Sequence, residues 1–156
     1  MVTVRLEPMT DEQYLRYRQR AEVTYAEHIV ASGAMPEPEA RKKARDDYER
    51  LLPAGLRTPD HHLWAAYDGP DEIGMLWLHV ERRSDGLHAF GYDFEVRAEL
   101  RRKGYGRAMI EAVEQVCRDL GVLSIGLSVF GFNLGARALY EQMGYETTAI
   151  RMHKRL

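Results

Sequence analysis

The segment of this sequence with the clearest chemistry covers residues 96–107. Gly104 and Gly106 stand immediately before an apolar pattern with helical spacing. Glycines let backbone N–H groups approach a ligand closely, and a helix N-terminus offers unpaired donors and partial positive charge. Basic residues outnumber acids here: Arg97, Arg101, Arg102, Lys103 and Arg107. The segment therefore predicts a diphosphate site, with a solvated basic face beside helix-capping glycines as the alternative.

Two widespread nucleotide-binding motifs do not fit this segment. The dinucleotide fingerprint G-x-G-x-x-G requires a third glycine where Met109 stands. The sequence also lacks the G-x-x-x-x-G-K-[ST] pattern that wraps the phosphates of ATP or GTP. The predicted diphosphate ligand therefore belongs to another class of cofactor.

A different family pattern does fit. Residues 101–106 resemble the (Q/R)-x-x-G-x-(G/A) signature of the GNAT N-acetyltransferase superfamily, and residues 96–100 resemble its V-x-P-E-x lead-in, with Ala98 in place of proline. Residues 133–145 are similar to the family's N-x-x-A-x-x-L-Y-x-x-x-G-F segment, with Tyr145 in place of phenylalanine. With both motifs present, the chain is identified as a member of this superfamily.

The resemblance implies that acetyl-CoA binds between two splayed strands, near residues 94–96 and 123–129. Main-chain groups of Phe94 and Val96 would hold the pantetheine arm, and the loop amides would cradle the diphosphate. The cofactor-binding residues implied in this way are Phe94, Val96, Arg101, Arg102, Lys103, Gly104, Tyr105, Gly106, Arg107, Asn133 and Ala136.

Tyr140 is the catalytic acid that the resemblance implies. Asn133, Ala136, Arg137 and Tyr140 share one side of a predicted helix. Attack of an amine on a thioester expels a sulfur anion, which a hydroxyl within hydrogen-bond reach can protonate or stabilise. The alternative is a half-buried tyrosine whose hydroxyl bonds to the backbone.

The group that removes the amine proton is less defined. Asp93 and Glu95 are expected on one face of their strand, opposite Phe94 and Val96. Glu95 is our preferred base, acting directly or through water; an ordinary solvated carboxylate is the alternative. Some family members carry a glutamate earlier in this strand, but Phe90 appears at that position, so this role does not transfer.

Other reactive residue types favour structural roles. Cys117 fits the apolar face of a helix, as expected for a core thiol. His61 and His62 are consecutive in an extended segment and face opposite ways, and His88 should lie opposite Glu81 rather than His79. We therefore expect no metal site.

These residues need a scaffold, and the periodicity predicts one. Strands are expected at 2–6, 62–67, 73–80, 88–96, 123–129 and 145–153, and helices at 11–32, about 36–52, about 107–120 and 133–143. Phe90, Tyr92, Phe94 and Val96 should share one strand face. The order βααβββαβαβ predicts a mixed α/β fold, GNAT-like, with a mostly antiparallel sheet in a single domain over residues 1–156.

Composition limits the remaining function classes. The chain has 156 residues, 45% of them hydrophobic, and a formal net charge of -2, which disfavours nucleic-acid binding. No apolar run approaches the ~20 residues of a membrane span, and a single cysteine favours the cytoplasm. We therefore expect a cytoplasmic acetyl-CoA-dependent N-acetyltransferase acting on a small-molecule or peptide amine. The resemblance adds a homodimer as one option for its assembly. The alternative is a non-catalytic acyl-CoA-binding regulatory module.

Overall fold

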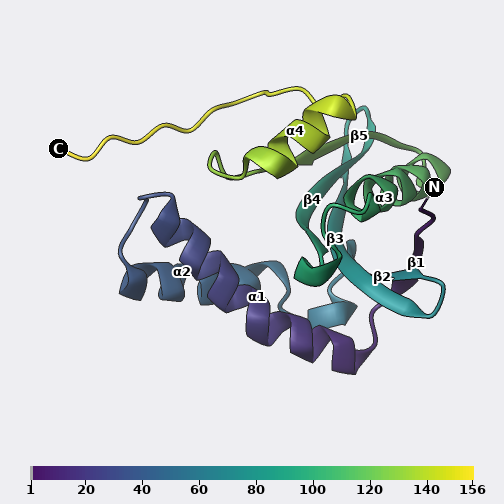
Figure 1. Cartoon of the computed structure of the whole chain (residues 1–156), viewed down its shortest axis with the longest axis horizontal. Helices are drawn as coiled ribbons and strands as arrows, with labels where there is room; N and C mark the ends of the chain where they lie inside the picture. The colour runs from purple at the N-terminus through teal and green to yellow at the C-terminus, as the bar shows by residue number, and fades with distance from the viewer. Residues whose placement is uncertain (1) are drawn as a thin grey trace. The chain divides into compact units, whose positions relative to one another are not determined.

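The computed structural model describes residues 2–156 (Figure 1). The chain divides into two compact units. The first unit combines the N-terminal residues up to Tyr14 with Ala54–Ser128. The second combines Leu15–Pro53 with Val129–Leu156. The mixed α/β class is confirmed, whereas the expectation of one domain over residues 1–156 stays a prediction.

The first unit is built on a five-stranded sheet in the order β1-β2-β3-β4-β5. Its strands are β1 (Arg5–Pro8), β2 (His61–Asp68), β3 (Asp71–Arg83), β4 (Gly86–Val96) and β5 (Val122–Leu127). The first four pair antiparallel, and β5 lies parallel to β4. Short turns make the meander possible, because Gly69 adopts φ 58° between β2 and β3. The predicted register of His88 opposite Glu81 is confirmed.

Helix α3 (Tyr105–Leu120) covers one face of this sheet. Its apolar stripe buries Met109, Val113 and Cys117 against Leu76 and Leu78 of β3. Gly121, with φ 79°, ends the helix, as glycine does at most left-handed helix termini. Short 3-10 turns occur at Gly55–Arg57 and Ala98–Leu100. This packing fixes α3 on the sheet, and the helix begins at Tyr105, after the loop that follows β4.

A bulge in β4 changes the predicted face pattern. The register shifts between Trp77 and Leu78, so that Phe90 pairs with His79 but Phe94 pairs with Leu76. Phe94 and Val96 pack on the core under α3, whereas Tyr92 stacks on Trp77 on the opposite face. The expectation that Phe90, Tyr92, Phe94 and Val96 share one face is therefore wrong, because a bulge inserts an extra residue and reverses the alternation.

The second unit holds most of α1 (Asp11–Ala31), with α2 (Glu37–Leu51) and α4 (Leu134–Gln142). The start of α1 carries a capping box: Gln13 N–H donates to Thr10 Oγ1 (3.1 Å), and Thr10 N–H donates to Gln13 Oε1 (2.9 Å). Ala26 and Ile29 of α1 pack against Ala40 and Ala44 of α2. Small residues at this contact let the two helices approach closely.

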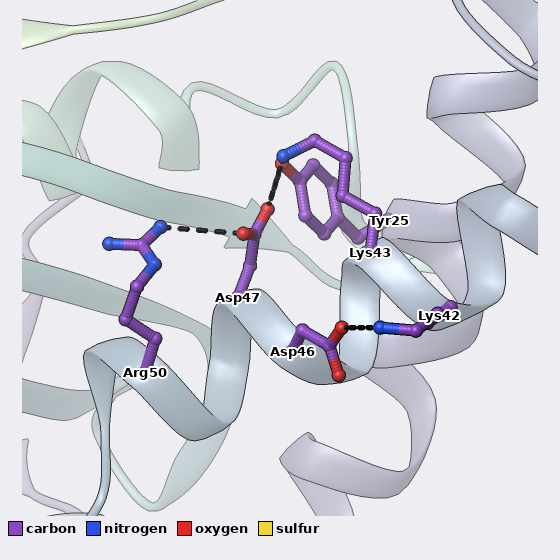
Figure 2. A network of polar contacts seen from close by, with 6 residues as sticks. All are labelled: Tyr25, Lys42, Lys43, Asp46, Asp47 and Arg50. Atoms are coloured by element: carbon purple, nitrogen blue, oxygen red, sulfur yellow. Dashed lines mark hydrogen bonds and ion pairs between the residues drawn. The ribbon is translucent and has the colours of Figure 1, made fainter.

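A polar network joins the same two helices (Figure 2). Tyr25 donates to Asp47 Oδ2 (3.0 Å), which also accepts from Lys43 Nζ (2.8 Å), while Arg50 reaches Asp47 Oδ1 (3.3 Å). Burial, followed by the charge of Asp47, raises the pKa of Tyr25 to about 12. Burial alone would raise the pKa of Asp47, but the hydrogen bonds from Lys43 and Tyr25 outweigh it and lower that pKa. Asp47 therefore stays ionised and anchors α2 to α1.

The predicted last strand over residues 145–153 does not form. Within residues 2–156, no strand follows β5, and residues 146–156 are exposed. Ile150 is 70% and Met152 89% exposed, so this alternating apolar pattern has no surface to pack on. A strand needs a neighbour for its backbone groups, and a local pattern cannot supply one.

Candidate functional site

The predicted diphosphate loop forms a tight turn between β4 and α3. Arg97 N–H donates to Ile73 O (2.9 Å), and Arg101 Nε donates to Val96 O (3.2 Å), which fixes the exit from β4. Arg102 (φ 65°) and Gly104 (φ 88°) then adopt left-handed backbone conformations. Such a conformation is costly for arginine and suits glycine. The chain turns sharply enough to start α3 at Tyr105.

This turn presents backbone donors at the helix N-terminus. Gly104 is the N-cap and supplies no side-chain cap, and the first helical bond is Ala108 N–H to Gly104 O (3.2 Å). First-turn amides of an α-helix have no acceptor within the helix, and the macrodipole adds partial positive charge. The predicted residues 101–107 thus form the loop and the first residues of α3. Their basic side chains, Arg101, Arg102, Lys103 and Arg107, are exposed. This arrangement can bind a diphosphate.

Tyr105 has a structural role that the sequence did not reveal. Its hydroxyl donates to Asp68 Oδ2 (2.7 Å) at the end of β2, which ties the start of α3 to the sheet. That hydrogen bond raises the pKa of Tyr105. A cleft of about 400 Å³ lies beside it, lined by Pro70, Asp71, Glu72, Ile73, Arg97, Leu100 and Tyr105. Arg97 Nη2 lies 3.6 Å from Glu72 Oε2 there, so its charge is partly balanced.

The predicted separation of two parallel strands is also present. The β4–β5 ladder ends at Gly91↔Leu127, whereas the β3–β4 ladder continues to Gly74↔Val96. Beyond Gly91, β5 no longer pairs with β4. Every second residue of β4 therefore directs its backbone N–H and C=O groups toward the side where β5 would continue the ladder. Phe94 and Val96 lie in this stretch, as the pantetheine assignment requires. Their cofactor contacts stay a prediction.

The backbone of this stretch depends on two glycines. A Cβ at Gly74 would lie 2.2 Å from Glu95 O and 3.0 Å from Met109 Sδ. A Cβ at Gly91 would lie 2.5 Å from Phe94 Cζ, because the Phe94 ring covers that position. All three distances are below van der Waals contact. These glycines let β4 approach β3 and let Phe94 fold back toward the core.

We expect Gly74→Ala to destabilise the protein by about 1–3 kcal/mol, the usual cost of overpacking a tight site. The new methyl group has to displace the Glu95 carbonyl, so acetyl-CoA binding should weaken as well. Gly126→Ala in β5 is the matched control for stability, because its Cβ would meet Phe90 at 3.4 Å, an ordinary contact. Denaturant unfolding and calorimetric titration measure both effects. Equal stabilities for the two variants would contradict this account.

Glu95 lies opposite Met75 on β3, while Asp93 lies opposite Trp77. Both therefore face away from the core that holds Phe94 and Val96, as predicted. Glu95 is partly buried. Its role as the base stays a prediction.

An array of aromatic and histidine rings shares the face of Asp93 and Glu95. Trp77 stacks on Tyr92 (4.7 Å between centroids), and His61 stacks on His79 (4.3 Å). Trp77 Nε1–H donates to His61 Nδ1 (3.0 Å). His62 instead stacks on Trp64, which confirms that the two consecutive histidines face opposite ways. The sequence did not reveal this array because it needs the β2–β3 register, His61↔His79.

The pKa of His61 provides a test of this array. Burial, and then the charge of His79, lowers the pKa from 6.5 to about 4. Between pH 6.5 and about 4, the imidazole of His61 is protonated in the unfolded chain and neutral in the folded chain. The free energy of unfolding should therefore fall as pH drops through this range. Titration of the imidazole by NMR should give this low pKa. Trp77→Phe, which removes the donor to Nδ1, should raise it, and an ordinary pKa in the native protein would contradict the geometry.

The second predicted motif lies on α4, in the second unit. Asn133 is the N-cap of α4: its Oδ1 accepts from Ala136 N–H (3.3 Å). Tyr140 packs edge-to-face on Tyr145, with ring centroids 5.6 Å apart, and Tyr140 O accepts from Tyr145 N–H (3.0 Å). Asn133 and Ala136 thus have a local structural role. Their cofactor contacts and the catalytic role of Tyr140 stay predictions.

Cys117 behaves as a structural group. Cys117 is 2% exposed, and burial raises the pKa of its thiol to about 11, which disfavours the nucleophilic thiolate. In the part of the chain that the structure describes, no group of three or more His, Cys, Asp or Glu side chains could hold a metal ion. None of the helices within residues 2–156 combines the length and apolar character of a membrane span.

Comparisons with known proteins agree with this fold. The acetyltransferase (GNAT) family matches residues 23–145. An uncharacterized N-acetyltransferase of Bacillus subtilis, YycN, is 36% identical over 99% of this chain and 100% of its own length. A second B. subtilis protein of that description, YdgE, is 33% identical over 97% of each chain. The crystal structure of YycN aligns over 99% of both chains with a TM-score of 0.95.

These similarities place the chain among enzymes that transfer acyl groups. It belongs to the GNAT acetyltransferase family and is an N-acetyltransferase. An aminoglycoside acetyltransferase from a soil metagenome, in complex with sisomicin, shares the fold at 15% identity and a TM-score of 0.63. At that identity the likeness concerns the fold alone.

Proposed function

We propose that the protein transfers an acetyl group from acetyl-CoA directly to a primary amine. The observation that carries this proposal is the turn through Arg102 and Gly104, which presents the N-terminal amides of α3. The turn follows the end of β4, which β5 no longer pairs with beyond Gly91. Such a turn accommodates a diphosphate, and the exposed edge of β4 can hydrogen-bond an extended amide-containing arm.

The reaction needs no covalent intermediate on the protein. The neutral amine attacks the thioester carbonyl, the C–S bond breaks, and the thiolate leaves. Tyr140 donates its hydroxyl proton to that sulfur, and Glu95, directly or through a water molecule, takes the proton that the amine loses. A carboxylate in this role also attracts a protonated amine, which favours cationic acceptors.

Calorimetric titration with acetyl-CoA tests the cofactor part of the proposal. Binding should weaken as salt rises, because exposed arginine and lysine side chains meet phosphate groups. NADH and ATP should not compete. Failure of acetyl-CoA to bind would overturn the proposal.

A panel of amines tests the catalytic part. Release of the CoA thiol is followed with amino acids, polyamines, aminoglycosides and peptides as acceptors. Thiol release that depends on one acceptor class would support direct transfer and identify the substrate. Tight acetyl-CoA binding without release of the CoA thiol in the presence of any acceptor class would instead indicate a binding module.

A further inference from the structure

A serine, a histidine and an aspartate form a continuous hydrogen-bond chain beside the turn between β3 and β4. His88 Nε2 lies 2.7 Å from Asp85 Oδ1, and His88 Nδ1 lies 2.6 Å from Ser124 Oγ of β5. The hydrogen bond from His88 lowers the pKa of Asp85, so its carboxylate is an anion at neutral pH and can only accept. His88 Nε2 therefore carries the proton that it donates to Asp85. In the neutral imidazole Nδ1 is then the acceptor, and the Ser124 hydroxyl donates to it.

The position of Ser124 beside His88 depends on a bulge in β5. Leu87 pairs with Val122, but His88 pairs with Ser124, so that Leu123 is an extra residue between the two pairs. With regular pairing, His88 would lie opposite Leu123, and Ser124 would point to the other face of the sheet. A bulge re-aims a side chain in this way, and such bulges are frequent at sheet edges and beside active sites. The irregular pairing thus brings a hydroxyl to the imidazole.

The hydrogen-bond chain is accessible at its serine end. Ser124 is exposed, whereas the His88 side chain is only 12% exposed, held between its two partners. Leu123 is 61% exposed and packs against the turn, because a Cβ at Gly86 would lie 2.9 Å from Leu123 Cδ1. Glycine at this position therefore lets β5 approach the turn that carries Asp85. A small molecule can reach a hydroxyl that is already bonded to a base.

We propose that this chain is a second, hydrolytic site of the protein, where Ser124 is the nucleophile toward small activated esters, His88 the base and Asp85 the group that positions the imidazole. Ser124 Oγ forms a bond to the ester carbonyl carbon while its proton moves to His88 Nδ1. The C–O bond to the alcohol breaks, and the imidazolium gives its proton to the departing oxygen. Water then attacks the acyl-serine through the same base, which releases the carboxylic acid and restores the hydroxyl.

The edge position of β5 supplies donors for the oxyanion of this reaction. Among the described residues, β5 is the last strand in the sheet order and pairs with β4 alone. The N–H groups on its outer side therefore have no partner strand, and such groups can stabilise the negative charge on the carbonyl oxygen. This site lies within the first unit and uses neither acetyl-CoA nor an amine, so it is independent of the N-acetyl transfer proposed above.

Covalent labelling of the full chain with a biotinylated fluorophosphonate tests the nucleophile. An activated serine displaces fluoride from phosphorus and keeps the probe, and peptide mass spectrometry identifies the labelled residue. We expect the label on Ser124 of the native protein and its loss after heat denaturation and in Ser124→Ala. Ser84→Ala is the matched control, since Ser84 lies in the same turn but outside the hydrogen-bond chain, and it should label as the native protein does. No label, or a label confined to other residues, would overturn the proposal.

Hydrolysis of 4-nitrophenyl acetate without acetyl-CoA tests the other two residues. His88→Gln should lower the rate about 100-fold, within the range of a general base. Asp85→Asn should slow hydrolysis about 10-fold or more, because an amide no longer fixes the tautomer of His88, and Asp85→Glu should restore most of the rate. Circular dichroism confirms that each variant is folded. Native rates in His88→Gln, or equal losses in Asp85→Asn and Asp85→Glu, would show that the chain only holds the turn against β5 and would overturn the proposal.

Discussion

Gly104→Val should abolish measurable acetyl-CoA binding, weakening it about 100-fold or more. Gly104 has φ 88°, and a β-branched residue is strained there, so the turn has to change shape. The diphosphate would lose at least two hydrogen bonds to charged oxygens, each contributing about 1.5–3 kcal/mol. Calorimetric titration measures the loss, and thiol release with a good acceptor should fall in parallel.

Gly121 offers a matched control at the other end of the same helix. It has φ 79°, and no atom of a described residue beyond its own helix and chain neighbours lies within 4 Å of its Cβ position, while the Cβ position of Gly104 has Val2 Cγ2 at 3.9 Å. Gly121→Val should therefore cost similar stability, about 1–2 kcal/mol, but leave the affinity for acetyl-CoA unchanged. Equal losses of affinity in both variants would show that helix strain, rather than the turn, controls binding.

Those parts of the site that depend on neighbouring residues were predictable from the sequence. The glycine-rich turn, the start of α3 and the capping box of Thr10 and Gln13 each follow from a few adjacent residues. Asn133 at the start of α4 is of the same kind, because its side chain caps the helix three residues later. Local hydrogen bonds and φ preferences decide these features, so the pattern contains the information.

Features that depend on distant segments were not predictable. The bulge near Tyr92 arises where β4 meets β3, and it places Tyr92 on Trp77 rather than with Phe94. The ring array needs the pairing of His61 with His79. For residues 145–153 the alternation predicts a strand that does not form, because a strand also needs a partner. Register and partner choice are properties of the packed chain.

Tyr140→Phe should lower kcat by about 100-fold or more, within the range that general acids contribute. The phenyl ring preserves the edge-to-face contact with Tyr145, so helix α4 should keep its structure. The affinity for acetyl-CoA should stay unchanged, because the hydroxyl acts on the sulfur only as the C–S bond breaks. Steady-state kinetics with the best acceptor, together with calorimetric titration, separate these two quantities.

Tyr145→Phe is the control for this assignment. It removes a hydroxyl from the other member of the same ring pair and leaves the packing intact, so its kcat should stay close to the native value. A general acid is also expected to impose a decline in kcat at high pH, which Tyr140→Phe should abolish. Equal kcat values in the two variants would exclude Tyr140 as the acid, since packing near α4 would then explain any loss. A selective loss in Tyr140→Phe, with the altered pH profile, would identify the hydroxyl as the proton donor to the leaving thiolate.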